Sequence, residues 1–446
     1  MLGKFKFYTS LILARAAYLG IKLFSKSGGT SFAGMAVLKY YPDFLSNCGG
    51  YIKEKIITVT GTNGKTTTSG LISHILETAH QTVIHNLKGA NMLTGVANMF
   101  ALGIAPFRKF DYAVIESDEA YLTRLYDYMK SDCLVVTNLF RDQLDRYGEL
   151  ATTAGFIQDA ISKNPDLKLI LNADDPLVAG FGREKNTVYY GFEDVQYDCN
   201  YTQTSNAPSE AFNCKCGGHL EYSKRFFAQQ GHYFCKNCGF IRPACDYSAS
   251  AVIYNDKSII KVKHNEIEYE FKVNLVGLYN AYNALASITL AFELGLNQSE
   301  IQKALDNFKS IFGRTEQRKI NGHPALIQLI KNPTGASEVL KTVDLDSNIL
   351  IAINDNYADG RDISWLWDSD FEQLKGIKKT VVTSGTRAED MALRLKYAGI
   401  SQEKIIIEKS IEKAIALISA SEDKSEKITI LPSYTALLKI NKMKIK

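Results

Sequence analysis

A glycine-rich turn placed directly after an apolar strand constrains this chain more than any other feature. Residues 58–68 read TVTGTNGKTTT and follow two isoleucines. In such a turn glycines let backbone N–H groups approach phosphate oxygens, a lysine adds positive charge, and a hydroxyl at the start of the next helix can bind Mg²⁺. The turn therefore predicts a nucleotide-binding α/β fold in which Lys65 meets phosphate and Thr66 binds Mg²⁺. Its spacing is shorter than that of the general P-loop.

Short β-branched runs alternate with helical patterns along most of the chain. Between about residues 53 and 176 this alternation predicts a parallel α/β sheet, with functional loops at the carboxyl ends of its strands. After about residue 320 a second alternation predicts a Rossmann-like α/β domain. We expect an N-terminal helical segment, a central P-loop domain, a cysteine-rich insertion within it and a C-terminal domain, at residues 1–50, 51–318, 196–246 and 319–446.

Composition narrows the function classes. A net charge of only +4 over 446 residues gives no bulk attraction to nucleic acid, so we expect no nucleic-acid partner. Eight cysteines, four of them in one short segment, predict a metal site in a reducing compartment. We therefore expect a cytoplasmic protein.

The N-terminal segment raises the question of a membrane. Residues 5–24 are fairly apolar, but Arg15 and Lys22 interrupt them, which argues against a transmembrane span. A packed helix is the favoured interpretation. An amphipathic helix that touches the inner face of the membrane with a basic side is one alternative, and a signal peptide is another.

A carboxylate follows a second strand of the predicted sheet. Glu116 ends an apolar run at the edge that carries the phosphate turn. Because Mg²⁺ prefers oxygen ligands, Glu116 is predicted to bind Mg²⁺ together with Thr66 and to act with Lys65 in phosphoryl transfer. The alternative is that Glu116 belongs to an acidic cluster that caps a helix. A polar run at residues 138–148 follows the next strand and points to the same site.

Four cysteines form two pairs on glycine-containing turns, CKCGG and CKNCG. Four thiolates can hold a closed, tetrahedral structural zinc, which stabilises a module too small to have its own core. The first pair is Cys-x-Cys rather than Cys-x-x-Cys, so Cys245, His219 or His232 is an alternative ligand. We predict a structural zinc ribbon with the ligands Cys214, Cys216, Cys235 and Cys238.

Several motifs together resemble the central domain of the Mur ligase family. They are the phosphate turn, Glu116, the run at 138–148, the segment NADDP, the segment GLYNAYNALA and a late Gly-Arg pair, at residues 61–67, 116, 138–148, 172–176, 277–286 and 313–314. The resemblance implies that asparagines hold the adenine side of ATP and that an arginine meets its phosphates. The implied ATP-binding set is Thr62, Asn63, Gly64, Lys65, Thr66, Thr67, Asn280, Asn283 and Arg314.

The chain also departs from the usual pattern of that family. Only some fifty residues precede the phosphate turn, so we expect no UDP-binding domain. Gln143 stands where the family places a metal-binding histidine, and residues 149–162 contain no lysine to be carbamylated. We therefore expect no second Mg²⁺ site.

These departures, the cysteine insertion and the C-terminal segment NDNYADGRDISW resemble one branch of the family, the ligase-like subunits of lipid II isoglutaminyl synthase. That resemblance implies amidation of the α-carboxylate of D-glutamate in the lipid II stem peptide to D-isoglutamine. ATP would form an acyl phosphate that ammonia attacks. The alternative is a Mur-type ligase that adds an amino acid to a peptidoglycan or folate-like acceptor.

The ammonia is expected to come from another chain. No cysteine lies in a nucleophile-elbow context with a suitable histidine partner, so this chain is not predicted to hydrolyse glutamine itself. The resemblance implies a heterodimer with a GatD-like class I glutamine amidotransferase, in which Asp355 orients the partner's histidine. Asp362 is the second choice, and a set of turn-capping aspartates is the alternative. Lys331 is a candidate contact for the ATP γ-phosphate.

Overall fold

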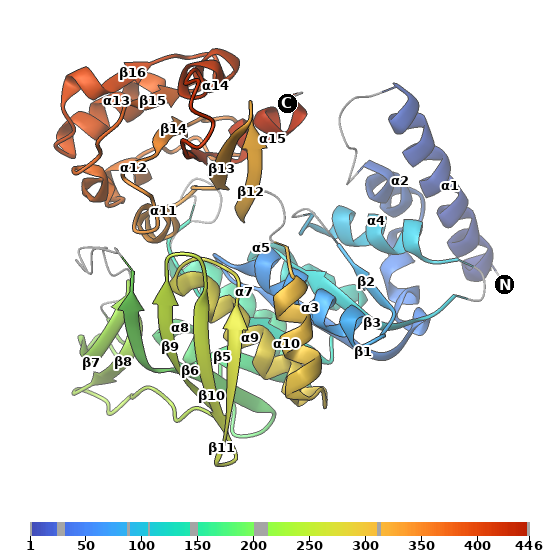
Figure 1. The fold of residues 1–446 in the computed structure, drawn as a ribbon. Helices are drawn as coiled ribbons and strands as arrows, with labels where there is room; N and C mark the ends of the chain where they lie inside the picture. The colour runs from blue at the N-terminus through green and yellow to red at the C-terminus, as the bar shows by residue number, and fades with distance from the viewer. Residues whose placement is uncertain are drawn as a thin grey trace.

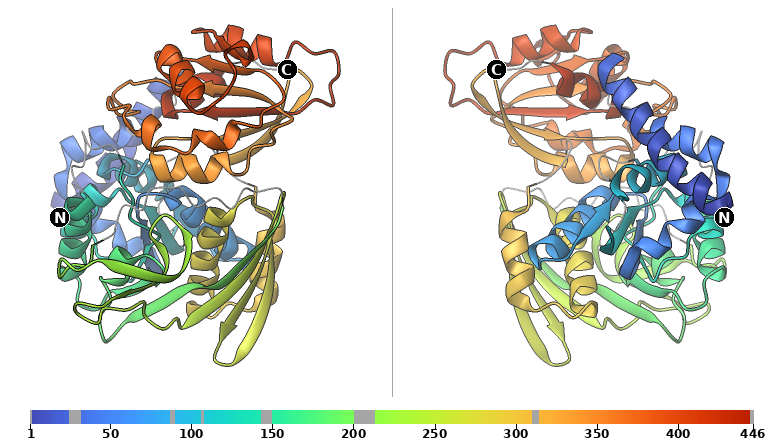
Figure 2. Two further views of the ribbon diagram at one scale, coloured as in Figure 1. Left: turned by 90° about the vertical axis from the view of Figure 1, so that its left-hand side faces the viewer. Right: turned by 90° about the vertical axis from the view of Figure 1, so that its right-hand side faces the viewer.

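The computed structural model describes residues 2–24, 32–86, 90–105, 108–142, 150–199, 213–309 and 314–443. They form a central domain, a C-terminal domain that covers one of its edges, and an N-terminal helical segment at one side (Figure 1). Figure 2 shows the C-terminal domain lying across the top of the central domain from both sides. No helix among the described residues is long and apolar enough to cross a membrane.

The central domain is built on a nine-stranded sheet in the order β11-β10-β9-β6-β5-β4-β1-β3-β2. In this order, neighbouring strands from β9 through to β2 pair in parallel. Strand β10 pairs antiparallel with both β9 and β11. The strands are β1 (Ile52–Thr60), β2 (Val83–His85), β3 (Phe110–Glu116), β4 (Cys133–Val136), β5 (Lys168–Asn172), β6 (Thr187–Asp198), β9 (Tyr247–Tyr254), β10 (Ser258–His264) and β11 (Ile267–Val273). The helices are α3 (Lys65–Thr78), α4 (Leu93–Gly103), α5 (Glu119–Tyr128), α7 (Leu150–Ser162), α8 (Pro176–Ala179), α9 (Leu278–Glu293) and α10 (Gln298–Asn307).

Helices cover both faces of this sheet. Because side chains alternate along a strand, Cys133 and Val135 of β4 pack with α3 and α9, whereas Leu134 and Val136 pack with α4, α5 and α7. Strands buried on both faces are apolar throughout, as in other parallel sheets. Cys133 is fully buried, and burial raises the pKa of its thiol to about 11, which fits a core residue.

A small hairpin is inserted between β6 and β9. Its strands β7 (Leu220–Phe227) and β8 (Gln230–Cys235) are antiparallel and form a sheet of their own. In Figure 1 this hairpin and the N-terminal segment lie at opposite sides of the central domain.

The C-terminal domain has a six-stranded sheet in the order β12-β13-β17-β14-β15-β16. Only the β12–β13 pair is antiparallel, and β12 starts at Arg314, so the chain enters this sheet before residue 319. The elements are β12 (Arg314–Ile320), β13 (His323–Gln328), α11 (Pro333–Leu340), β14 (Asn348–Ala352), α12 (Trp365–Asp368), β15 (Val381–Ser384), α13 (Ala388–Tyr397), β16 (Ile405–Ile407), α14 (Ile411–Ile418), β17 (Ile428–Pro432) and α15 (Tyr434–Lys442).

The N-terminal segment consists of α1 (Leu2–Phe24), α2 (Phe32–Tyr40) and short 3₁₀ turns at Pro42–Asn47 and Gly49–Tyr51. One face of α1 is packed: the Phe7 ring stacks on Phe44 and Tyr51 at centroid distances of 5.1 and 5.5 Å. Leu11 and Ala14 are buried in the same cluster. The prediction of a packed helix is therefore confirmed for this face.

Candidate functional site

The phosphate turn joins β1 to α3 at the carboxyl edge of the central sheet. Gly64 begins the helix with a φ of +86°, a conformation that favours glycine. A Cβ atom at Gly64 would lie 2.1 Å from Asn283 Oδ1 on α9. The turn therefore requires glycine for its backbone angle and for the close approach of α9.

Lys65 is buried at the start of α3 and is held by opposite charge. Its Nζ donates to the Gly61 carbonyl at 2.5 Å and to Glu119 Oε1 at 2.9 Å. Burial alone would lower the pKa of Lys65, but the charges of Glu119 and Asp118 outweigh it, so the pKa lies above its ordinary value. Lys65 is thus a fixed cation. Glu119 was not singled out from the sequence, although it stands three residues after Glu116.

Thr66 and Glu116 meet as the sequence predicts. The Thr66 hydroxyl donates to Glu116 Oε2 at 2.8 Å, and both side chains are buried. A hydroxyl and a carboxylate oxygen beside a phosphate turn form a donor set that fits Mg²⁺. The helix cap that was the alternative role belongs to Asp118, which accepts from the Ala120 N–H at 3.2 Å.

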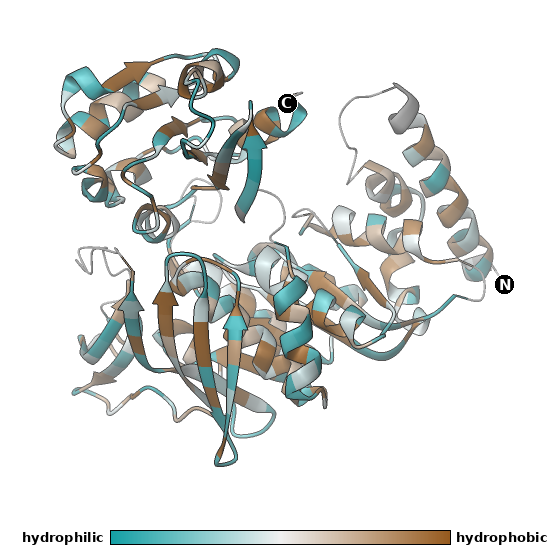
Figure 3. Ribbon diagram, in the orientation of Figure 1, coloured by the Kyte–Doolittle hydropathy of each residue, from teal (hydrophilic) through white to brown (hydrophobic). Residues whose placement is uncertain are grey.

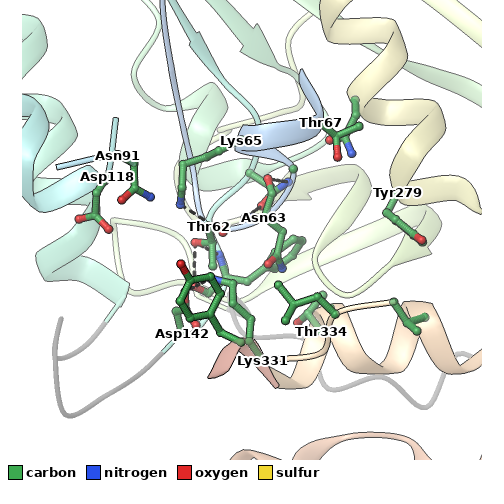
Figure 4. A pocket seen from close by; sticks show the side chains of 18 of the residues that line it. Thr62, Asn63, Lys65, Thr67, Asn91, Asp118, Asp142, Tyr279, Lys331 and Thr334 are labelled. Atoms are coloured by element: carbon green, nitrogen blue, oxygen red, sulfur yellow. Dashed lines mark hydrogen bonds and ion pairs between the residues drawn. The ribbon is translucent and has the colours of Figure 1, made fainter. Parts of the chain in front are cut away.

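A cavity of about 420 Å³ opens beside the turn, between the two domains. Figure 4 shows Lys331 and Thr334 of the C-terminal domain facing Thr62 and Asn63 of the phosphate turn. The predicted site residues that line the cavity are Thr62, Asn63, Gly64, Lys65, Thr67, Glu116, Asn283 and Lys331.

Two further predicted residues, Thr66 and Asn280, are not among the residues that line the cavity. Asn280 sits one turn before Asn283, accepts a 3.3 Å hydrogen bond from its Nδ2, and donates to the Val276 carbonyl at 2.8 Å. In this position Asn280 supports Asn283. The backbone of Arg314 is in β12, while its side chain and Gln143 lie outside the described part of the chain.

Contacts from the C-terminal domain reach the phosphate turn. The Lys331 ammonium pairs with Asp142 at 2.5 Å. Asn332 donates to Asn63 Oδ1 at 3.0 Å and accepts from Asn63 Nδ2 at 3.3 Å. Asp142 belongs to the run at 138–148 that was predicted to point to this site, whereas Asn332 was not proposed as a site residue. Both residues join the two domains at the cavity.

The tip of the inserted hairpin also reaches the cavity. Phe227, the last residue of β7, lines it, and its ring lies 5.9 Å from that of Phe140 and 5.6 Å from that of Tyr282. Gln229 donates to the Leu139 carbonyl at 2.5 Å. Phe140 in turn exchanges two 3.0 Å hydrogen bonds with the Thr62 hydroxyl, so the hairpin tip connects to the phosphate turn.

The four predicted cysteines gather at the other end of the hairpin. Their Sγ atoms all lie within 4.8 Å of one another, with 3.5 Å between Cys214 and Cys238 and 3.6 Å between Cys216 and Cys235. Tetrahedral bonds of about 2.3 Å place sulfurs about 3.8 Å apart, so the set fits one metal ion.

Side chains around the cluster agree with this ligand set. A hydrogen bond from Asn237 and one from the Gly218 N–H lower the pKa of Cys216 to about 6. The Phe240 backbone lowers the pKa of Cys238, but contacts with the Cys216 and Cys214 thiols outweigh it and raise that pKa, so Cys216 is the thiolate of this pair. The alternative ligand Cys245 instead accepts from Arg242 at 3.2 Å. His232 Nε2 lies 2.8 Å from the Phe192 carbonyl.

Asp355 follows β14 at the carboxyl edge of the second sheet. It pairs with Arg387 at 2.7 Å, accepts from the Thr386 hydroxyl at 2.7 Å, and keeps a quarter of its side chain exposed. The Thr386 hydroxyl and then Arg387 lower the pKa of Asp355, so it is anionic at neutral pH. Asp362 takes a turn role and accepts from the Ser364 N–H at 2.8 Å. Asp359 accepts from the Asn356 N–H in its own loop at 3.2 Å and from the Thr435 N–H of α15 at 2.7 Å.

Family models match both domains. The model of the Mur ligase middle domain matches residues 59–291, and that of the MurT ligase C-terminal domain matches residues 329–437. The chain is 36% identical over 435 residues to a lipid II isoglutaminyl synthase (glutamine-hydrolyzing) subunit MurT of Staphylococcus aureus strain COL, covering 96% of each chain. It is 34% identical over 422 residues to the subunit of that name from Streptococcus pneumoniae, covering 93% of this chain and 92% of the relative.

Solved structures share the fold. A pseudomurein peptide ligase type C from Methanothermus fervidus matches with a TM-score of 0.65 at 24% identity, over 88% of this chain and 79% of that one. MurF from Acinetobacter baumannii matches with a TM-score of 0.63 at 16% identity, over 91% and 79%. At these identities the likeness supports the Mur ligase-like fold alone, and it confirms the predicted α/β architecture.

Proposed function

The chain belongs to the MurT family, and from this membership we propose that it is the ATP-dependent synthetase subunit of a glutamine-hydrolysing lipid II isoglutaminyl synthase. Its reaction would convert the α-carboxylate of D-glutamate in the lipid II stem peptide into the amide of D-isoglutamine. The observation that carries the proposal is the Thr66–Glu116 pair at the phosphate turn, next to the buried Lys65. Glu116 and Lys65 line a cavity to which both domains contribute.

The chemistry follows from these positions. An oxygen of the substrate carboxylate attacks the γ-phosphorus of ATP, ADP leaves, and ammonia then attacks the acyl carbon of the resulting acyl phosphate. Phosphate leaves with the former carboxylate oxygen, and loss of a proton from nitrogen gives the amide. Thr66 and Glu116 would hold Mg²⁺, which offsets phosphate charge when bound. Lys65 supplies a fixed positive charge next to the phosphates, and Lys331 can meet the γ-phosphate from the C-terminal domain.

We propose that the ammonia comes from a GatD-like amidotransferase docked on the C-terminal domain. Asp355 is anionic, is partly exposed and is oriented by Arg387 and Thr386, so it can face a histidine of that partner. A carboxylate in this place orients the imidazole and stabilises its protonated form. Two residues further on, Tyr357 to Asp359 line the cavity, so one short segment joins the proposed ammonia source to the amidation site.

We assign Zn²⁺ to the four-cysteine cluster. A closed set of four thiolates leaves no open position for a substrate, so its role is structural. Because lipid II is anchored in a membrane, the proposed reaction places the protein at the inner membrane face.

The decisive experiment combines the purified chain, a GatD-like partner, glutamine, ATP and lipid II, and analyses the stem peptide by mass spectrometry. We expect one amide on the D-glutamate α-carboxylate and no product without ATP. The alternative, an amino-acid ligase, predicts ligation of a free amino acid instead. Formation of that product without any amide would refute the proposal.

A further inference from the structure

The outer face of α1 carries an apolar stripe. Phe5, Ile12 and Leu19 are 65%, 67% and 58% exposed, and Tyr8 and Ala16 fall between them on the same side of the helix. The steps of three and four residues place all five on one face. In Figure 3 apolar and polar segments alternate along this helix. A large exposed apolar stripe on a helix of this length marks an interaction surface.

The second helix enlarges this surface. Phe32 and Met35 of α2 are each about half exposed, at 51% and 50%, and Tyr40 at its end is also exposed. The Tyr40 hydroxyl lies 3.2 Å from the Thr9 hydroxyl, which ties the end of α2 to the outer side of α1. We call seven of the exposed apolar residues of the two helices the N-terminal face: Phe5, Tyr8, Ile12, Leu19, Phe32, Met35 and Tyr40.

Charge decides which kind of partner this face fits. Residues 1–42 contain six lysines and arginines and no aspartate or glutamate, whereas the whole chain has a net charge of only +4. Lys4, Lys6 and Lys39 are exposed on the two helices. Apolar helices whose charged residues are all cations have the pattern of helices that lie on anionic lipid.

The N-terminal face is connected to the cavity by α4. Residues 90–92 line the cavity, and α4 begins directly after them. Gly34 of α2 packs so closely on α4 that a Cβ atom there would lie 1.8 Å from the Thr94 carbonyl oxygen. Contact at this face would therefore hold the 90–92 side of the cavity close to the same surface.

We propose that the N-terminal face lies on the anionic surface of a lipid bilayer and so presents the cavity to a lipid-anchored substrate. Presentation of the cavity to a lipid-anchored substrate rests on the proposed function, whereas contact of the face with the bilayer does not. The face inserts only side chains, because the helix is interrupted by charge and lies flat.

The test is flotation of the full chain, alone and with its amidotransferase partner, with phosphatidylcholine vesicles that contain or lack phosphatidylglycerol. We expect binding to the anionic vesicles only, weakened by added salt. Ile12→Glu with Leu19→Glu should reduce vesicle binding at least about tenfold, and Lys4→Gln with Lys6→Gln should reduce it several-fold. Tyr397→Glu, at a residue of α13 that is 71% exposed, is the matched control and should bind like the unchanged chain.

Other results would overturn the proposal. These are equal binding to neutral and anionic vesicles, binding that survives both double substitutions, or loss of the amidotransferase complex in the Ile12→Glu, Leu19→Glu variant, which would make the face a protein interface. Amidation of detergent-solubilised lipid II is measured in parallel and should change less than twofold. Flotation needs neither ATP nor turnover. A failure of the proposed function would therefore change the result of the amidation assay and leave the flotation result unchanged.

Discussion

The two α/β domains place carboxylates at the same structural position and hold them in different ways. Glu116 ends β3 of the central sheet, is buried, and accepts from the Thr66 hydroxyl, and within the described residues it has no ion pair with a lysine or arginine. Asp355 follows β14 of the C-terminal sheet, is partly exposed, and pairs with Arg387. A buried carboxylate that is hydrogen-bonded to a threonine hydroxyl beside a phosphate turn is suited to a metal ion. One that is oriented by arginine but open to solvent is suited to another protein chain.

The strongest test of this comparison is Asp355→Asn. Glutamine-driven amidation should fall by about 10⁴-fold, as in triads that lose their carboxylate, because the partner's histidine loses its orienting anion. Amidation driven by added ammonium should stay within twofold, since Asp355 does not line the cavity. Rates with both nitrogen sources are compared, with Asp362→Asn as control. Equal loss of both rates would place Asp355 in the synthetase chemistry instead.

The opposite pattern is expected on the central side. Lys65→Ala and Thr66→Val should each reduce glutamine-driven and ammonium-driven amidation together, by about 10³-fold, because the phosphate contacts serve both. Lys163→Ala, which removes an exposed lysine paired with Asp127, is the control. Lys65→Ala leaves Glu119 buried without its cation, which can destabilise the fold, so thermal unfolding of this variant is measured as well. Thr66→Val keeps the Lys65–Glu119 ion pair and so tests the site without this loss. Retained ammonium-driven activity in Thr66→Val would contradict the assignment.

The inserted hairpin connects the four-cysteine cluster to the central cavity. Substitutions in the hairpin are expected to give a third and smaller effect. Cys235→Ser should lower the bound zinc measured by atomic absorption and raise the KM for ATP about tenfold, because Phe227 loses its support at the cavity. Phe227→Ala should give the same KM with zinc retained, whereas Phe227→Tyr should restore it. Cys245→Ser is the matched control, since Cys245 contacts Arg242 rather than the cluster. An unchanged KM in Phe227→Ala would separate the ribbon from nucleotide binding.

Local motifs explain why one part of the site was predictable and another was not. Thr66 and Glu116 each follow a strand of the same parallel sheet, and such strand ends meet at one edge, so their contact could be expected from the sequence. The pairing of Asn63 with Asn332 spans 269 residues and depends on how the two domains dock, which no local pattern encodes. The contact of Phe227 with the cavity was not predicted for the same reason, because the cysteine-rich insertion was interpreted as a separate module.

The folded structure also bears on a point that the cysteine spacing left open. The Cys-x-Cys spacing allowed Cys245 or a histidine as a ligand, and only the folded knuckles place all four sulfurs of the two pairs together. The boundary between the two sheets was likewise hidden. The first strand of the second sheet pairs antiparallel with its neighbour and reads as a polar edge strand, unlike the apolar parallel strands that follow.

The smallest expected effect concerns the contact that joins the two domains. The Lys331–Asp142 pair is only partly buried, so the ion pair itself should contribute about 0.5–1 kcal/mol, or two- to fivefold in activity. Asp142→Asn should therefore reduce ammonium-driven amidation two- to fivefold. Lys331→Ala should reduce this activity further, because the γ-phosphate contact is lost as well.

The double variant separates the two roles of Lys331. If Lys331 serves only the ion pair, the two single variants lose equal activity, and Asp142→Asn causes no further loss in the Lys331→Ala background. A larger loss for Lys331→Ala, seen in kcat rather than in KM, would instead show that the C-terminal domain contributes directly to phosphoryl transfer.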